Sequence, residues 1–112
     1  MRMGRFRAEA VMVKQVDNLT IVFYDKESIY IKDDTHGWTV FHRWFVPKGL
    51  YGETWKPFRK LLWEEKQITF NHCYRLAFRY SIQSMANVKP PDLGKVKIVE
   101  KIFINNQNKE VN

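Results

Sequence analysis

The chain has 112 residues, of which 45% are hydrophobic, and it carries a formal net charge of +7. This length suits one globular domain and is too short for two, and the hydrophobic share excludes a largely disordered chain. Aromatic residues make up 15% of the chain, enough to build a dense core in a small domain.

The single cysteine, Cys73, cannot form a disulfide within the chain, which is typical of proteins from a reducing compartment. No apolar run approaches the roughly 18–20 residues that cross a bilayer, and the basic start lacks the apolar stretch of a signal peptide. We therefore expect a soluble, cytoplasmic protein that does not contact a membrane.

The positive charge is concentrated in the middle of the chain. Residues 1–34 contain six basic and six acidic side chains, whereas residues 35–91 contain nine basic and three acidic ones. Twelve of the seventeen aromatic residues also lie in 35–91. A basic surface attracts polyanions and raises their encounter rate, so this segment is the place to look for a binding function.

The first 46 residues predict strands. Residues 6–15 alternate between apolar and polar side chains, and Asp17-Asn18 is a turn signal. The runs 19–24 and 29–32 then indicate a hairpin, and 38–46 is again rich in strand formers.

A helix is expected at about 54–66. Its apolar residues repeat at helical spacing, and Thr54 is placed to cap its start. Pro57 falls in the first turn, where its missing N–H removes no hydrogen bond. The apolar residues are Trp55, Phe58, Leu61 and Leu62, and the outer face carries Lys56, Arg59, Lys60 and Glu64.

Residues 67–83 fit two patterns. Even positions from 68 to 82 are apolar except His72, which favours a strand, and a bend near His72 would leave that strand at about 73–83. A second helix at 71–86 is the alternative, with Asn71 as its cap, but its apolar stripe would omit Leu76 and Tyr80. We favour the strand. Arg75 and Arg79 share a face in either structure.

The last expected strand covers 95–104, with a bulge-like change of phase at Glu100-Lys101, and 105–112 is a polar, frayed tail. The predicted fold is α+β. A twisted antiparallel sheet of about five to six strands carries one main helix, within a single domain at 1–104.

Non-enzymatic nucleic-acid binding is the function that these patterns favour. Basic side chains alternate with aromatic ones through 35–91, so phosphate contacts and base stacking would occur together. We expect DNA or RNA as the partner, with single strands slightly favoured. The expected phosphate contacts are Arg43, Lys56, Arg59, Lys60, Arg75 and Arg79, and the expected stacking rings are Trp44 and Tyr51.

Two other classes of function compete with this one. A small adaptor or inhibitor would bind a larger protein through the aromatic loop 44–58, because Trp, Tyr and Arg dominate binding hot spots. A metal-independent nuclease would need one of His36, His42 and His72 beside an arginine, and no spacing favours that arrangement.

Known motifs give no further assignment. No phosphate-binding loop, dinucleotide fingerprint or metal-ligand spacing is present, so we expect no cofactor and no metal. Signatures of common nucleic-acid-binding modules are also missing. If 71–86 were helical, residues 54–86 would have the spacing of a helix-turn-helix, with His72, Arg75, Arg79 and Gln83 on the groove-reading face.

Overall fold

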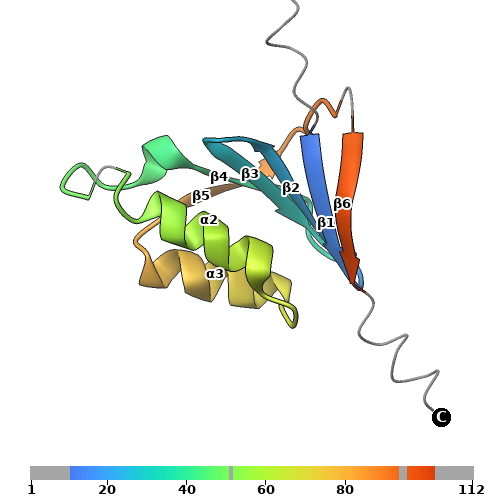
Figure 1. Ribbon diagram of the computed structural model, residues 1–112. Coiled ribbons are helices and arrows are strands. Elements are labelled where there is room, and N and C mark those ends of the chain that lie inside the picture. Colours follow the sequence, from blue (N-terminus) through green and yellow to red (C-terminus); the bar gives the residue numbers. More distant parts are fainter. Residues whose placement is uncertain (1–10, 51, 94–95, 103–112) are drawn as a thin grey trace, which may run out of the picture.

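The chain folds into a twisted six-stranded sheet with two helices packed on one face, as a computed structural model shows (Figure 1). The structure describes residues 11–50, 52–93 and 96–102. The strand order is β5-β4-β3-β2-β1-β6, in which β6 is parallel to β1 and all other neighbours are antiparallel. The predicted α+β class is therefore confirmed. The elements are β1 (Val11–Val16), β2 (Leu19–Asp25), β3 (Ser28–Lys32), β4 (Trp38–His42), a 3₁₀ turn η1 (Arg43–Phe45), α2 (Trp55–Glu64), α3 (Phe70–Arg79), β5 (Ser84–Val88) and β6 (Val96–Ile102).

The strands of the first half were predicted correctly. Strands β2 and β3 form the expected hairpin, and Asp17 takes a positive φ of 55° in the turn that joins β1 to β2. The strand predicted at 38–46 is shorter than expected, because the chain leaves the sheet at Arg43 and turns through η1. Of the strand predicted at 6–15, residues 6–10 lie outside the described part of the chain.

Helix α2 confirms the helix predicted at 54–66, with narrower bounds. It buries Trp55, Phe58 and Leu62 against the sheet. Thr54 does occupy the N-cap position, but its side chain makes no capping hydrogen bond. The indole Nε1 of Trp55 donates to the Lys26 carbonyl oxygen at 2.7 Å, which links the first turn of the helix to the turn between β2 and β3.

The preferred strand at 73–83 is wrong, because residues 70–79 form helix α3. The alternation in this stretch placed Phe78 inside and Cys73 and Ala77 outside, but the structure buries Cys73 and Ala77 and exposes 88% of Phe78. Cys73 and Ala77 share one face of the helix with Phe70 and Leu76, and this apolar face is the buried side of α3.

The second helix, predicted as an alternative at 71–86, has the right type but the wrong bounds. Thr69 caps it instead of Asn71, because Thr69 Oγ1 accepts the N–H of His72 at 3.2 Å. Ser81 ends it with a φ of 59°, while Ile82 N–H donates to the Ala77 carbonyl oxygen at 2.8 Å. This closing pattern resembles a Schellman motif with serine in place of glycine. The chain then forms strand β5.

Strand β6 contains the expected irregularity. Val13 of β1 pairs with Ile98, and the next residue, Lys14, pairs with Glu100. Strand β6 therefore has one extra residue, Val99, which is a β-bulge directly before the predicted phase change. The predicted tail at 105–112 lies outside the described residues.

The main core lies between the sheet and the two helices. Strands β2, β3 and β4 contribute Ile21, Phe23, Ile29, Ile31 and Phe41, which pack on the buried residues of α2 and α3. The opposite face of the sheet carries a smaller cluster around Val22, with an edge-to-face series of rings from Tyr24 through Tyr30 to Trp38. Burial, followed by the nearby Tyr24 and Asp25, raises the pKa of Tyr30. No helix within the described ranges is both long and apolar enough to span a bilayer.

Candidate nucleic-acid interface

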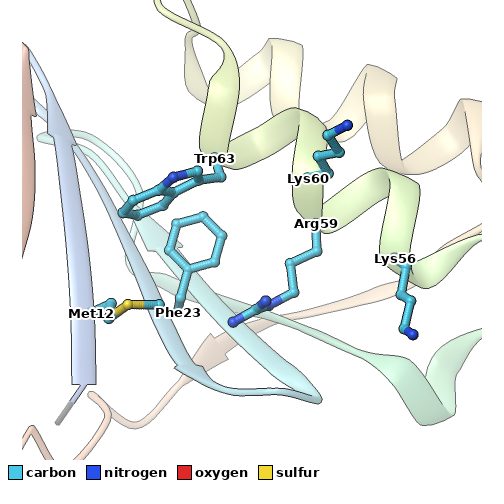
Figure 2. Close-up of a pocket in the computed structure, with 6 residues that line it drawn as sticks. All are labelled: Met12, Phe23, Lys56, Arg59, Lys60 and Trp63. Atoms are coloured by element: carbon cyan, nitrogen blue, oxygen red, sulfur yellow. The ribbon is translucent and has the colours of Figure 1, made fainter.

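A cavity of about 370 Å³ lies between α2 and the first two strands. Its apolar walls come from Met12 on β1, Phe23 on β2 and Trp63 on α2, and its cations are Lys56, Arg59 and Lys60. Helical periodicity explains the grouping, because residues 56, 59, 60 and 63 lie on one side of a helix. Three of the predicted phosphate contacts are therefore brought together beside aromatic rings, as Figure 2 shows.

Arg59 and Trp63 point from the helix towards Phe23, whereas Lys56 and Lys60 extend away from the rings (Figure 2). The Phe23 and Trp63 rings meet edge to face, with their centroids 5.0 Å apart. The Arg59 guanidinium carbon lies 5.5 Å from the centroid of Phe23, within the range of a cation–π interaction. Arg59 Nε is buried and has no hydrogen-bond partner among the residues that the structure describes.

The outer surface of α3 carries the second group of predicted residues. Arg75 and Arg79 are both exposed, and Phe78 lies between them in the sequence with 88% of its surface exposed. With Tyr74 they line a shallow depression of about 530 Å³. Within the described part of the chain, neither arginine makes an ion pair or a hydrogen bond through its side chain.

The remaining predicted residues lie apart from the two helices in the sequence. Arg43 and Trp44 are in η1, where Arg43 Nη1 is 3.5 Å from Glu27 Oε2 and is therefore already near a carboxylate. Trp44 is 57% exposed, so its ring is accessible. Tyr51 lies outside the described residues.

Two of the three histidines, His36 and His42, make local side-chain hydrogen bonds. His36 Nδ1 is 2.8 Å from Asp33 Oδ1, and its ring stacks on Phe70 with the centroids 3.9 Å apart. Partial desolvation raises the pKa of Asp33, but hydrogen bonds from His36 and Thr35 outweigh it and lower the pKa overall. His42 Nδ1 accepts the N–H of Trp44 at 2.9 Å.

His72 Nε2 is 4.0 Å from Glu65 Oε2 and lies on α3 with Arg75 and Arg79. Gln83 lies beyond the end of this helix, so the groove-reading face imagined for a helix-turn-helix does not extend to it. Among the described residues, no three of His, Cys, Asp and Glu gather as they would around a metal ion.

The sequence interpretation missed the aromatic part of both surfaces. Trp63 follows Arg59 by four residues, so a helical projection of 54–66 would have found it. Phe78 was assigned to the core because the strand pattern was preferred. Met12 and Phe23 come from strands whose position beside α2 depends on tertiary packing, which no local pattern in the sequence indicates.

Comparisons with protein-family models, with curated proteins and with solved structures found no match for this chain.

Proposed function

We propose that this protein binds nucleic acid without catalysing a reaction on it, and that its helical layer forms the binding surface. The observation that carries the proposal is the outer face of α3, where Phe78 is 88% exposed next to Arg75 and Arg79. Because Phe78 buries so little of its surface, it contributes little to the stability of the isolated protein. It can stack on a base while the neighbouring guanidinium groups contact phosphates.

The distribution of charge supports the same surface. Lys56, Arg59 and Lys60 on α2 add three cations to the two on α3. The only carboxylate of α2 is Glu64, and its ion pair with Lys60 at 3.9 Å is between two exposed side chains. Glu64 is one carboxylate against the five cations of α2 and α3, so the two helices keep a net positive charge.

Two of the expected contacts have less support. The proximity of Glu27 to Arg43 offsets its charge, so we assign Arg43 a minor part in phosphate binding. Trp44 remains a candidate stacking ring because it is accessible. We also propose a cytoplasmic location, for which the support is the lone cysteine, Cys73.

The test is fluorescence anisotropy of labelled single-stranded and duplex DNA and RNA over a series of salt concentrations. Arg75→Gln/Arg79→Gln and Phe78→Ala should weaken binding and leave the thermal stability nearly unchanged, because all three side chains are exposed. The double variant should also reduce the slope of log affinity against log salt by roughly 0.7 per lost phosphate contact on a single strand.

The matched control is Lys26→Gln/Lys89→Gln, which removes the same charge from exposed positions outside the helices. The control should retain most of the affinity. Equal losses in both double variants would mean that only net charge matters, and no binding to any polymer at low salt would refute the proposal.

The accessible Trp44 ring supports one alternative, an adaptor or inhibitor that binds a protein partner through the loop 44–58. Two further aromatic residues of that segment, Trp55 and Phe58, belong to the core and are not available to a partner. Binding of this kind should persist at high salt and be lost in Trp44→Ala.

A further inference from the structure

The cavity between α2 and the first two strands is lined by three elements, whereas the depression on the exposed face of α3 is lined by residues of that helix alone. Its volume of about 370 Å³ falls within the range of roughly 300–1,000 Å³ that is usual for small-molecule sites. Side chains from three elements line it, so a ligand would contact more than one element while one side of it stayed open to solvent.

The apolar part of this cavity is suited to a flat ligand. Phe23 is only 2% exposed and is held by the core, and Trp63 is half-buried against it. Their edge-to-face contact, at an interplanar angle of 82°, leaves the two rings at nearly right angles. A planar group that enters from solvent can then meet an aromatic face on one side and the flexible Met12 on another.

The polar part of the cavity is suited to an anion. Arg59 Nε is buried without a partner among the described residues, which is an unfavourable state for a charged donor. Lys56 makes no ion pair within the described ranges, and Lys60 is held only by its long contact with Glu64. An anionic oxygen beside the Arg59 guanidinium group would form charge-assisted hydrogen bonds with it, and the two lysines would neutralise charge at the entrance.

We propose that this cavity binds one unpaired nucleotide of a single-stranded nucleic acid. The base would lie against Trp63, and the adjoining phosphate would contact Arg59 with Lys56 and Lys60. This inference rests on the proposed function and adds a preference to it, because a base reaches the cavity only if it has left the stack of a duplex. An acidic peptide would use the three cations but has no planar group for the aromatic walls.

The experiment compares a short thymidine oligonucleotide with an abasic oligonucleotide of the same length and the same phosphates. Stacking of a base on an aromatic side chain accounts for roughly 5- to 150-fold in affinity, so removal of the bases should weaken binding by at least part of that factor. Trp63→Leu should reduce this difference by weakening the thymidine oligonucleotide and leaving the abasic one unchanged, and the part that remains should be lost in Phe78→Ala.

Because Trp63 also packs on the core, a second variant keeps the proposal testable. Lys56→Gln/Arg59→Gln leaves the aromatic walls in place, and Arg75→Gln/Arg79→Gln removes the same charge from α3. The first variant should lower the ratio of single-strand to duplex affinity, and the second should lower both affinities together. Far-UV circular dichroism and thermal melting would confirm that each variant is folded.

The outcomes separate this inference from the function on which it rests. Equal affinity for thymidine and abasic oligonucleotides would overturn the nucleotide site together with base stacking on Phe78, and would leave phosphate binding intact. Binding to neither would overturn the proposed function itself. Thymidine monophosphate should compete only at far higher concentration than the oligonucleotide, and equally strong competition would overturn the assignment to a strand. Competition by a poly-glutamate peptide at the same concentration as the oligonucleotide would assign the cavity to acidic peptides.

Discussion

The lysine at position 14 gives the sharpest stability prediction. Lys14 lies on β1 and is fully buried. Its Nζ donates to the carbonyl oxygens of Leu62 and Trp63, each at 2.7 Å, and to that of Glu65. Helix α2 has no basic residue in its own last turn, so a lysine from the sheet supplies the cation that the negative end of the helix attracts.

Replacement of this side chain in Lys14→Met should destabilise the protein by about 3 kcal/mol. The substitution leaves three carbonyl oxygens without their donor. The bond to Leu62 is buried, and a buried acceptor without a partner costs about 1–3 kcal/mol. The bonds to Trp63 and Glu65 are only partly buried, so water can replace part of each lost hydrogen bond. The remaining cost is roughly 0.5–1 kcal/mol for each of these two carbonyl oxygens.

The assay is urea unfolding followed by circular dichroism. With an m value of about 1–3 kcal/mol/M for a small protein, the midpoint should fall by about 1–3 M. The control is Lys26→Met, the same substitution at an exposed turn position, which should change stability by less than about 0.5 kcal/mol. A Lys14→Met variant as stable as the original, or more stable, would mean that desolvation of the ammonium group outweighs its three bonds, and the reasoning would be refuted.

Three further predictions concern single groups. Burial raises the pKa of the Cys73 thiol to about 12. Because the unfolded thiol ionises at lower pH, stability should fall as the pH rises from about 9 towards 12, and Cys73→Ala should remove this part of the slope in urea titrations. Hydrogen bonds, including the one from His36, lower the pKa of Asp33. The ionised carboxylate therefore stabilises the folded protein above the pKa of Asp33 in the unfolded chain, and this stabilisation is lost below about pH 4. Melting curves of Asp33→Asn should therefore lack this acid sensitivity. Thr69→Ala should cost about 1 kcal/mol in thermal unfolding because it removes the cap of α3, whereas Thr54→Ala should be neutral, since the Thr54 hydroxyl is buried without a hydrogen-bond partner in the described chain.

The parts of the fold that local patterns determine were predictable. The hairpin of β2 and β3 follows from two short β-forming runs around a polar turn, and α2 follows from apolar spacing that fits one period only. Residues 68–82 fit both periods, and there the large side chains were misleading. The position of the core under α3 is marked by the small residues Cys73 and Ala77, which a search for bulky apolar side chains counts as exceptions.

For individual site residues, the sequence predicted which helix carries them but not which strands lie beside them. Lys56 and Lys60 were placed correctly on the outer side of α2, whereas Arg59 turns towards Phe23, and the cavity beside them needs two strands whose positions depend on long-range packing. Lys14 shows the same limit, because burial of a lysine becomes favourable only when the end of a particular helix meets it. A charged residue in a strand is otherwise expected at the surface.

Only part of the net charge of +7 is available for binding at the surface of the protein. Lys14 contributes to that number but contacts no solvent, and Arg43 lies close to Glu27. The cations of α2 and α3 therefore dominate the field on the helical side of the molecule. Lys14 also ties the end of α2 to β1, and this contact keeps Trp63 beside Phe23. The buried lysine thus supports the nucleotide cavity without touching a ligand, so Lys14→Met should weaken binding of the thymidine oligonucleotide even under conditions where the variant is fully folded.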